Sequence, residues 1–86
     1  MAKASKVPSA REIFARNLRR VRRLKDLTQE KVALEAGLTR AYVSAVEHGA
    51  RNISIDNMGR LAQALSIPLR DLVDPEQFKD VPSVSQ

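Results

Sequence analysis

The sequence predicts an all-α domain, a compact bundle of five helices. Its 86 residues leave room for a single hydrophobic core. Its apolar residues recur at spacings of three and four, whereas strands need an alternating pattern. Capping residues and glycines divide the chain into short segments of helical length. No apolar run approaches the roughly 20 residues of a membrane span, so we expect a cytoplasmic protein without a membrane role.

The first helix is predicted over residues 10–25. Ser9 and Glu12 fit the capping box, in which each side chain satisfies a backbone amide of the other residue. One face of this helix then carries the apolar residues Phe14, Leu18 and Val21. Residues 1–8, which precede the helix, contain two lysines and little to bury, so we expect a flexible basic arm.

Two short helices are predicted next. Thr28 caps the second helix, and Gly37 ends it because glycine enters the left-handed conformation without a Cβ penalty. Thr39 caps a third helix that ends near His48, before Gly49. The inner faces of these two helices carry Val32, Ala33, Ala36, Val43 and Val46.

The last helices are shorter and less regular. Ser54 starts a fourth helix, whose expected inner face consists of Ile55, Met58, Leu61, Ala62 and Leu65. A short fifth helix is indicated by Ile67, Leu69, Leu72 and Val73, with Pro68 in its first turn. Asp74 then fits the start of an extra helical turn through Phe78. The chain thus divides into the arm 1–8, a helical domain 9–74 and an acidic tail 75–86.

Three positions around the second turn carry functional information. Ala33 is a small residue where two helices must touch, Gly37 supplies the turn, and Val43 holds the third helix against the second. This spacing is typical of a helix-turn-helix, in which the second of the two helices enters the major groove of DNA. A plain helical hairpin is the alternative.

Residues 18–73 also resemble the lambda-repressor-like family, the Cro/CI or XRE helix-turn-helix domains. The likeness runs through LTQEKVALEAGLTRAYVSAVEHGARN and then LAQALSIPLRDLV. It rests on coupled positions, namely Arg22, Gln29, Ala33, Gly37, Val43, Glu47 and Gly49. The resemblance implies the five-helix fold of that family and a sequence-specific transcriptional regulator of double-stranded DNA, either a repressor or an autoregulator.

By the same resemblance, residues 39–48 form the recognition helix. The base contacts that it implies are Arg40, Ala41, Ser44 and Ala45. Arg40 alone among them can form a bidentate pair with guanine. The implied phosphate contacts are Gln29, Thr39, Tyr42, Arg51 and Asn52. The plainer alternatives are a solvated Arg40, a Tyr42 packed over the second helix and an ordinary exposed loop at residues 51–52.

The family often joins its first helix to the end of its third helix through an ion pair, and Arg22 and Glu47 occupy those places. Such a pair stabilises the fold if it is buried, because removing one partner strands the other charge. An exposed pair contributes almost nothing. The resemblance therefore implies a structural role for these two residues.

The net charge of +5 is unevenly distributed. Residues 1–25 hold nine basic residues and one acidic residue, residues 26–70 hold five of each, and residues 71–86 hold one basic and four acidic residues. The basic block favours a polyanionic partner. Four arginines that lie off the apolar stripe are expected mostly to face solvent, where they can attract DNA: Arg16, Arg19, Arg20 and Arg23.

The sequence argues against other classes of function. It has one histidine, no cysteine and three glycines, so it offers no catalytic triad, phosphate loop or metal cluster, and we expect neither an enzyme nor a cofactor. His48 is interpreted as a helix-end residue. A role for the arginine-rich first helix at a membrane surface is rejected, because the core needs the apolar face of that helix.

One recognition helix reads few base pairs, so we expect a homodimer on a palindromic operator. The candidates for its interface are the exposed members of Ile67, Leu69, Leu72, Val73 and Phe78. The alternative function is a protein with a further partner, either an antitoxin that binds a toxin or a controller of a restriction-modification system. In both cases DNA binding serves autoregulation.

Overall fold

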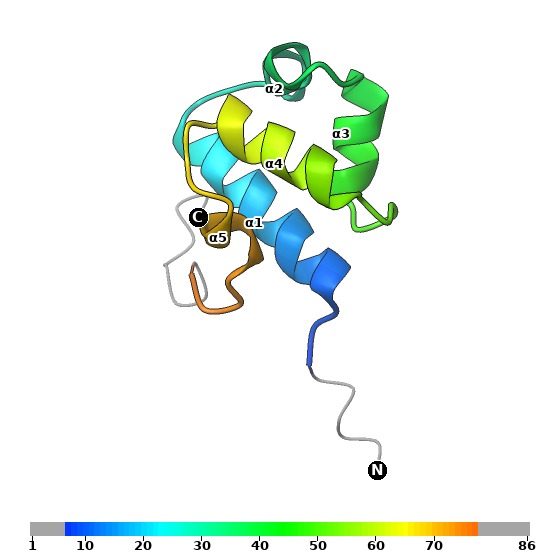
Figure 1. The fold of residues 1–86 in the computed structure, drawn as a ribbon, viewed down its shortest axis with the longest axis vertical. Coiled ribbons are helices and arrows are strands. Elements are labelled where there is room, and N and C mark those ends of the chain that lie inside the picture. The colour runs from blue at the N-terminus through cyan, green and yellow to red at the C-terminus, as the bar shows by residue number, and fades with distance from the viewer. Residues whose placement is uncertain (1–6, 78–86) are drawn as a thin grey trace.

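The structure, a computed structural model, describes residues 7–77. This part of the chain contains five helices and no strand: α1 (Ala10–Leu24), α2 (Gln29–Ala36), α3 (Arg40–Glu47), α4 (Ile55–Ala64) and α5 (Arg70–Val73). Figure 1 shows α2 and α3 together at one end of the bundle, while α5 lies against α1. The predicted all-α class is confirmed.

Each of the first four helices begins at the residue that the sequence predicts. Ser9 Oγ accepts a hydrogen bond from the Glu12 amide at 3.1 Å, and Glu12 Oε1 accepts one from the Ser9 amide at 2.8 Å, which completes the capping box. The side chains of Thr28, Thr39 and Ser54 each accept a hydrogen bond from a backbone amide three residues later. Local hydrogen bonding thus sets where these helices start.

The turn between α2 and α3 depends on Gly37. This residue adopts the left-handed conformation with φ of 73° and ψ of 31°. The Leu38 amide then donates to the Ala33 carbonyl at 2.9 Å, so the chain leaves α2 with its last carbonyls satisfied. The turn directs α3 across α2, and both helices bury their inner residues.

All five helices contribute buried residues to one core. Its buried members are Phe14, Leu18, Val21, Val32, Ala33, Ala36, Val43, Val46, Leu61, Ala62, Leu65 and Leu72. The expectation that Ile55 faces inward is wrong, because its side chain is 71% exposed. Ile55 is the first residue of α4, and a helical Cα–Cβ bond tilts toward the N-terminus, which here directs the side chain beyond the core.

The C-terminal part departs from the predicted outline. The fifth helix begins at Arg70, after Pro68, and the Asp71 amide donates to the Pro68 carbonyl at 3.0 Å. The expected extra helical turn is a hydrogen-bonded turn over residues 75–77, where Asp74 Oδ1 accepts from the Glu76 amide at 2.8 Å. Phe78, the expected end of that turn, lies outside the described residues. Among the helices of residues 7–77, none has the length and apolar character needed to cross a membrane.

Candidate nucleic-acid interface

Helix α3 presents one face to solvent and buries the other. Val43, Val46 and Glu47 are buried, whereas Arg40 and Ala41 are exposed. The other two predicted base contacts, Ser44 and Ala45, are half-buried. Since side chains on one helix keep a fixed angular relation, the three buried residues determine the direction in which the N-terminal part of α3 faces.

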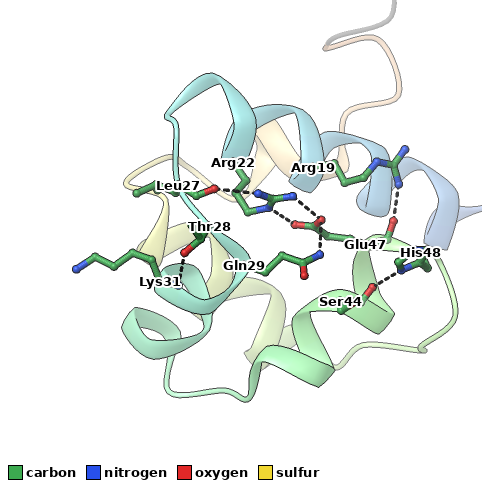
Figure 2. A network of polar contacts seen from close by, with 9 residues as sticks. All are labelled: Arg19, Arg22, Leu27, Thr28, Gln29, Lys31, Ser44, Glu47 and His48. Carbon is green, nitrogen blue, oxygen red and sulfur yellow. Dashed lines mark hydrogen bonds and ion pairs between the residues drawn. The ribbon is translucent and has the colours of Figure 1, made fainter. Parts of the chain in front are cut away.

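Glu47 is the centre of a buried polar network that joins three helices (Figure 2). Its carboxylate is 2% exposed and accepts from Arg22 Nε at 2.6 Å, from Arg22 Nη2 at 3.0 Å and from Gln29 Nε2 at 3.0 Å. Arg22 Nη1 also donates to the Leu27 carbonyl at 2.8 Å. The carboxylate of the ion pair is therefore buried and well supplied with donors, while its partner Arg22 is half-buried, and such a pair holds a fold together.

The C-terminal end of α3 is held by a second arginine of α1. Arg19 Nη1 donates to the backbone carbonyl of Glu47, and His48 Nδ1 lies 2.8 Å from the Ser44 carbonyl. A cation at a helix C-terminus satisfies free carbonyl groups and interacts favourably with the helix dipole. Helix α1 thus contacts both the side chain and the backbone of Glu47.

The expectation that most arginines of α1 face solvent is wrong. Arg23 is exposed, but Arg16, Arg19 and Arg20 are half-buried. Arg16 Nη2 donates to the Pro75 carbonyl at 2.9 Å. The long arginine stem packs along the surface and carries the guanidinium to carbonyl groups at the ends of neighbouring segments. Part of the basic block therefore serves the fold.

Gln29 has a structural role that the sequence did not reveal. It was predicted as a phosphate contact, and the structure places it, half-buried, in the first turn of α2 with one Nε2 hydrogen bonded to Glu47. An amide nitrogen carries two hydrogens, so the second can still reach an acceptor outside. The contact with Glu47 joins residues 18 apart in the chain.

Tyr42 and Arg51, two predicted phosphate contacts, lie together in the structure. The Arg51 guanidinium carbon lies 4.8 Å from the centre of the Tyr42 ring. Asn57 Nδ2 on α4 donates to the Tyr42 hydroxyl at 3.2 Å. The other two predicted phosphate contacts, Thr39 and Asn52, are exposed. The role of Asn57 is not evident from the sequence, where its only signal is its position three residues after the cap of α4.

Asn17 is a second missed residue. It is fully buried, and its Nδ2 donates to the Leu72 carbonyl at 3.2 Å and to the Asp74 carbonyl at 2.9 Å. Asn17 lies three residues after Phe14 and four before Val21, so it occupies an inward position in the apolar stripe of α1. A polar residue at such a position is a signal for a buried hydrogen bond.

The predicted dimer residues differ in exposure. Leu72 is 0% exposed in the core, so it is not one of the exposed members to which the interface prediction applies. Ile67 and Leu69 are half-buried against the core, and Val73 is 42% exposed. Phe78 lies outside the described residues. Val73 also lines an apolar groove with Ile13, Phe14, Ile53 and Met58.

The described residues contain no group of three or more histidine, cysteine, aspartate or glutamate side chains that could hold a metal ion. The polar side chains of the site are instead grouped around α3, with the donors Arg22 and Gln29 on the buried carboxylate of Glu47. Helices α2 and α3 are joined by a glycine turn, and α3 buries one face while the other is exposed to solvent. This arrangement defines the class as a helix-turn-helix domain.

Comparison with known proteins assigns the family. The helix-turn-helix family model matches residues 18–72, and the chain belongs to that family of DNA-binding transcriptional regulators. The control protein C.BamHI of Bacillus amyloliquefaciens is 40% identical over 65 residues, which span 74% of this chain and 80% of the relative. This is a family of DNA-binding regulators and not a known enzyme family.

Two solved structures resemble the chain in both sequence and fold. The restriction-modification controller protein C.AhdI from Aeromonas hydrophila is 45% identical with a TM-score of 0.71, over 72% of this chain and 94% of that one. The hypothetical transcription factor NHTF from Neisseria is 38% identical with a TM-score of 0.77, over 83% of this chain and 82% of that one. The expected likeness to helix-turn-helix regulators is confirmed.

Proposed function

We propose that this protein regulates transcription by placing α3 in the major groove of an operator. The observation that carries the proposal is the one-sided burial of α3, which fixes Val43, Val46 and Glu47 inward and leaves Arg40 and Ala41 open. Arg40 can form a bidentate pair with guanine N7 and O6, and Ala41 can contact a thymine methyl group. Half-buried Ser44 and Ala45 complete the proposed reading surface. A DNA target implies a cytoplasmic location.

The DNA backbone is bound by neighbouring donors in this proposal. Five residues that lie before, within and after α3 in the sequence supply these hydrogen-bond donors: Gln29, Thr39, Tyr42, Arg51 and Asn52. Contacts of this kind position a protein on the duplex without selecting its sequence. The protein therefore acts by binding, with recognition and attachment carried by different side chains.

A homodimer follows from the small number of base pairs that one helix reads. Two copies related by a two-fold axis present their recognition helices about 34 Å apart, which matches a palindromic operator. The exposed Val73 and the half-buried Ile67 and Leu69 are the proposed interface, beside the apolar groove that Val73 lines. Sedimentation at micromolar concentration tests this, and a 9.6 kDa species with and without DNA contradicts it.

Selection of binding sites from random duplexes tests the main proposal. Wild-type protein is expected to enrich paired half-sites with inverted symmetry. Arg40→Ala is expected to relax preference at particular base pairs, by about 1–3 kcal/mol. Arg51→Ala is expected to weaken all sites and to lower the slope of log affinity against log salt by about 1.

Arg60→Ala is the matched control, because Arg60 is exposed on the α2–α4 side of the domain. It removes the same charge and is expected to change neither base preference nor affinity by the amount seen for the other two variants. Absence of any enriched half-site in the wild-type selection contradicts the proposal and favours a module for protein interaction.

Control of a restriction-modification system is a second candidate, favoured by the similarity to C.BamHI and C.AhdI. Such a regulator retains the same use of α3, so genomic position and the selected operator distinguish it. An operator upstream of restriction or methyltransferase genes supports this candidate. The antitoxin alternative stays a prediction, and co-purification of a toxin with the tagged chain is its test.

A further inference from the structure

Three side chains from three segments meet beside the open face of α3. Tyr42 comes from the first turn of α3, Arg51 from the loop after it and Asn57 from the first turn of α4. The Tyr42 ring is half-buried against the core, and its hydroxyl accepts from Asn57 Nδ2 at 3.2 Å. The Arg51 guanidinium lies over the ring, with 4.8 Å from its central carbon to the ring centre. We call these three residues the donor cluster.

The hydrogen bond from Asn57 determines what the Tyr42 hydroxyl can do. A phenolic hydroxyl has one hydrogen to donate and lone pairs that accept. Because Asn57 supplies a hydrogen to the oxygen, the hydroxyl's own hydrogen points away from Asn57 and needs an acceptor elsewhere. Asn57 thereby makes Tyr42 a donor toward the outside.

Arg51 adds donors of the same sense. The guanidinium interacts with the ring as a cation, and with five N–H groups it can also donate to an acceptor outside the ring. The cluster presents a cation and an oriented hydroxyl to an acceptor, and none of the three side chains carries a negative charge. A group with several acceptor oxygens and a negative charge, such as a backbone phosphate, fits this arrangement.

The position of Asn57 is itself fixed by local structure. Its backbone amide donates to Ser54 Oγ at 3.1 Å, which closes the first turn of α4. Tyr42 is held in the same way by Thr39 Oγ, at 3.1 Å from the Tyr42 amide. The capped starts of α3 and α4 therefore bring the Tyr42 hydroxyl and the Asn57 side-chain amide together. Tyr42 lies two residues after Arg40 in the chain.

We infer that Asn57 is a positioning residue for binding of the DNA backbone, which acts by orienting the Tyr42 hydroxyl within a phosphate clamp shared with Arg51. This inference rests on the proposed DNA-binding function and extends it to a residue on α4, outside the helix-turn-helix. Asn57 contributes to affinity through Tyr42 and leaves base preference unchanged.

A double-mutant cycle on DNA affinity tests the inference. Asn57→Ala and Tyr42→Phe are each expected to weaken binding to a selected duplex about three- to tenfold, the range for one hydrogen bond. The double variant is expected to bind about as tightly as Tyr42→Phe alone, because Asn57 acts through the hydroxyl. Neither residue carries charge, so the salt slope is expected to stay that of wild type, in contrast to Arg51→Ala.

Gln63→Ala is the matched control, since Gln63 is an exposed amide side chain on the same helix. It is expected to bind DNA as wild type does. Thermal unfolding by circular dichroism, with affinity measured well below each midpoint, ensures that the comparison concerns folded protein.

Asn57→Asp replaces the hydrogen-bond donor at this position by an acceptor of nearly the same shape. A carboxylate accepts the Tyr42 hydrogen and removes it from the phosphate, so the loss of affinity is expected to exceed that of Asn57→Ala. Part of that loss comes from charge repulsion alone. The remainder is expected to disappear in the Tyr42→Phe background, where no hydroxyl can be redirected.

Several results overturn the inference. If Asn57→Ala binds DNA as tightly as Gln63→Ala does, Asn57 has no role in binding. If the affinity losses of the two single variants multiply in the double variant, Asn57 does not act through Tyr42. A change in base preference assigns Asn57 to base reading. If the wild type binds DNA and Arg40→Ala relaxes preference, such results reject this inference alone, whereas absence of wild-type DNA binding rejects the proposed function as well.

Discussion

Helix α1 is joined to two other parts of the chain through buried polar groups, and the two joints differ in how fully those groups are hydrogen-bonded. In the α1–α3 joint, formed by Arg19, Arg22 and Glu47, the buried carboxylate accepts three hydrogen bonds, two from Arg22 and one from Gln29. The α1–α5 joint consists of Arg16 and Asn17 with the carbonyls of residues 72, 74 and 75. There, Asn17 Oδ1 and Arg16 Nε are buried without a hydrogen-bond partner among the described residues.

The difference in hydrogen bonding between the two joints matches the different helices that they hold in place. A fully satisfied polar network specifies one arrangement, whereas buried groups without partners cost stability. The α1–α3 joint sets the direction of α3, the proposed recognition helix, for which a small displacement would change every proposed base contact. The α1–α5 joint instead positions a helix of only four residues, which contributes Leu72 to the core. We therefore expect α5 to open locally more often than α3.

The largest expected effect comes from breaking the α1–α3 joint. Glu47→Ala leaves the half-buried guanidinium of Arg22 without its carboxylate, and this is expected to cost about 3–5 kcal/mol of unfolding free energy. Urea denaturation followed by circular dichroism measures the loss. A cost below about 1 kcal/mol, the range of exposed pairs, contradicts the buried network.

A double variant separates the charge from the packing. Arg22→Met combined with Glu47→Leu removes both charges and keeps apolar volume, so it is expected to recover much of the stability lost in Glu47→Ala. Failure to recover any of it shifts the explanation from the stranded charge to the shape of the joint.

The next effect concerns the α1–α5 joint. Asn17→Ala leaves the carbonyls of Leu72 and Asp74 without the Asn17 donor, at an expected cost of about 1–3 kcal/mol. Hydrogen exchange is expected to accelerate at the amides of Asp71 and Leu72 more than in α3. Equal acceleration in α3 contradicts the separation of the two joints.

The smallest expected loss of stability comes from a change in the turn before α3, which also holds this helix in place. Gly37→Ala adds a methyl group that meets nothing within 4 Å, so the cost is that of the positive φ, about 1 kcal/mol. Gly59→Ala is the matched control, since Gly59 lies inside α4 in open space and alanine favours helix by about 0.5–1 kcal/mol. If Gly37→Ala costs more than Glu47→Ala, the turn and not the α1–α3 joint is the main support of α3.

Local signals predicted the larger part of the fold. Capping residues such as Ser9 and Thr39 and the turn glycine Gly37 act within four residues of themselves, so the sequence shows both partners of each interaction side by side. The Arg22 and Glu47 contact joins distant residues, and its expectation came from the family resemblance. Their charges alone did not identify them among the other acidic and basic residues.

The missed residues depend on partners far away in the chain. Asn17 bonds to carbonyls 55 and 57 residues later, and backbone carbonyls carry no sequence signal. Arg19 likewise donates to a backbone carbonyl of α3. Because that carbonyl carries no sequence signal, the sequence predicts only a solvated charge at Arg19. Asn57 reaches Tyr42 across 15 residues and two helices. Such contacts follow from the packing of the helices, which periodicity does not determine.

The one-sided anchoring of α3 has a consequence for how proteins of this architecture diversify. Val43, Val46 and Glu47 hold the helix, while the exposed Arg40 and Ala41 take no part in the described core. If α3 binds DNA as proposed, substitutions at the two exposed positions change the preferred DNA sequence at little cost in stability. A gene duplicate of this chain can therefore acquire a new operator by a few surface changes and keep an unaltered scaffold.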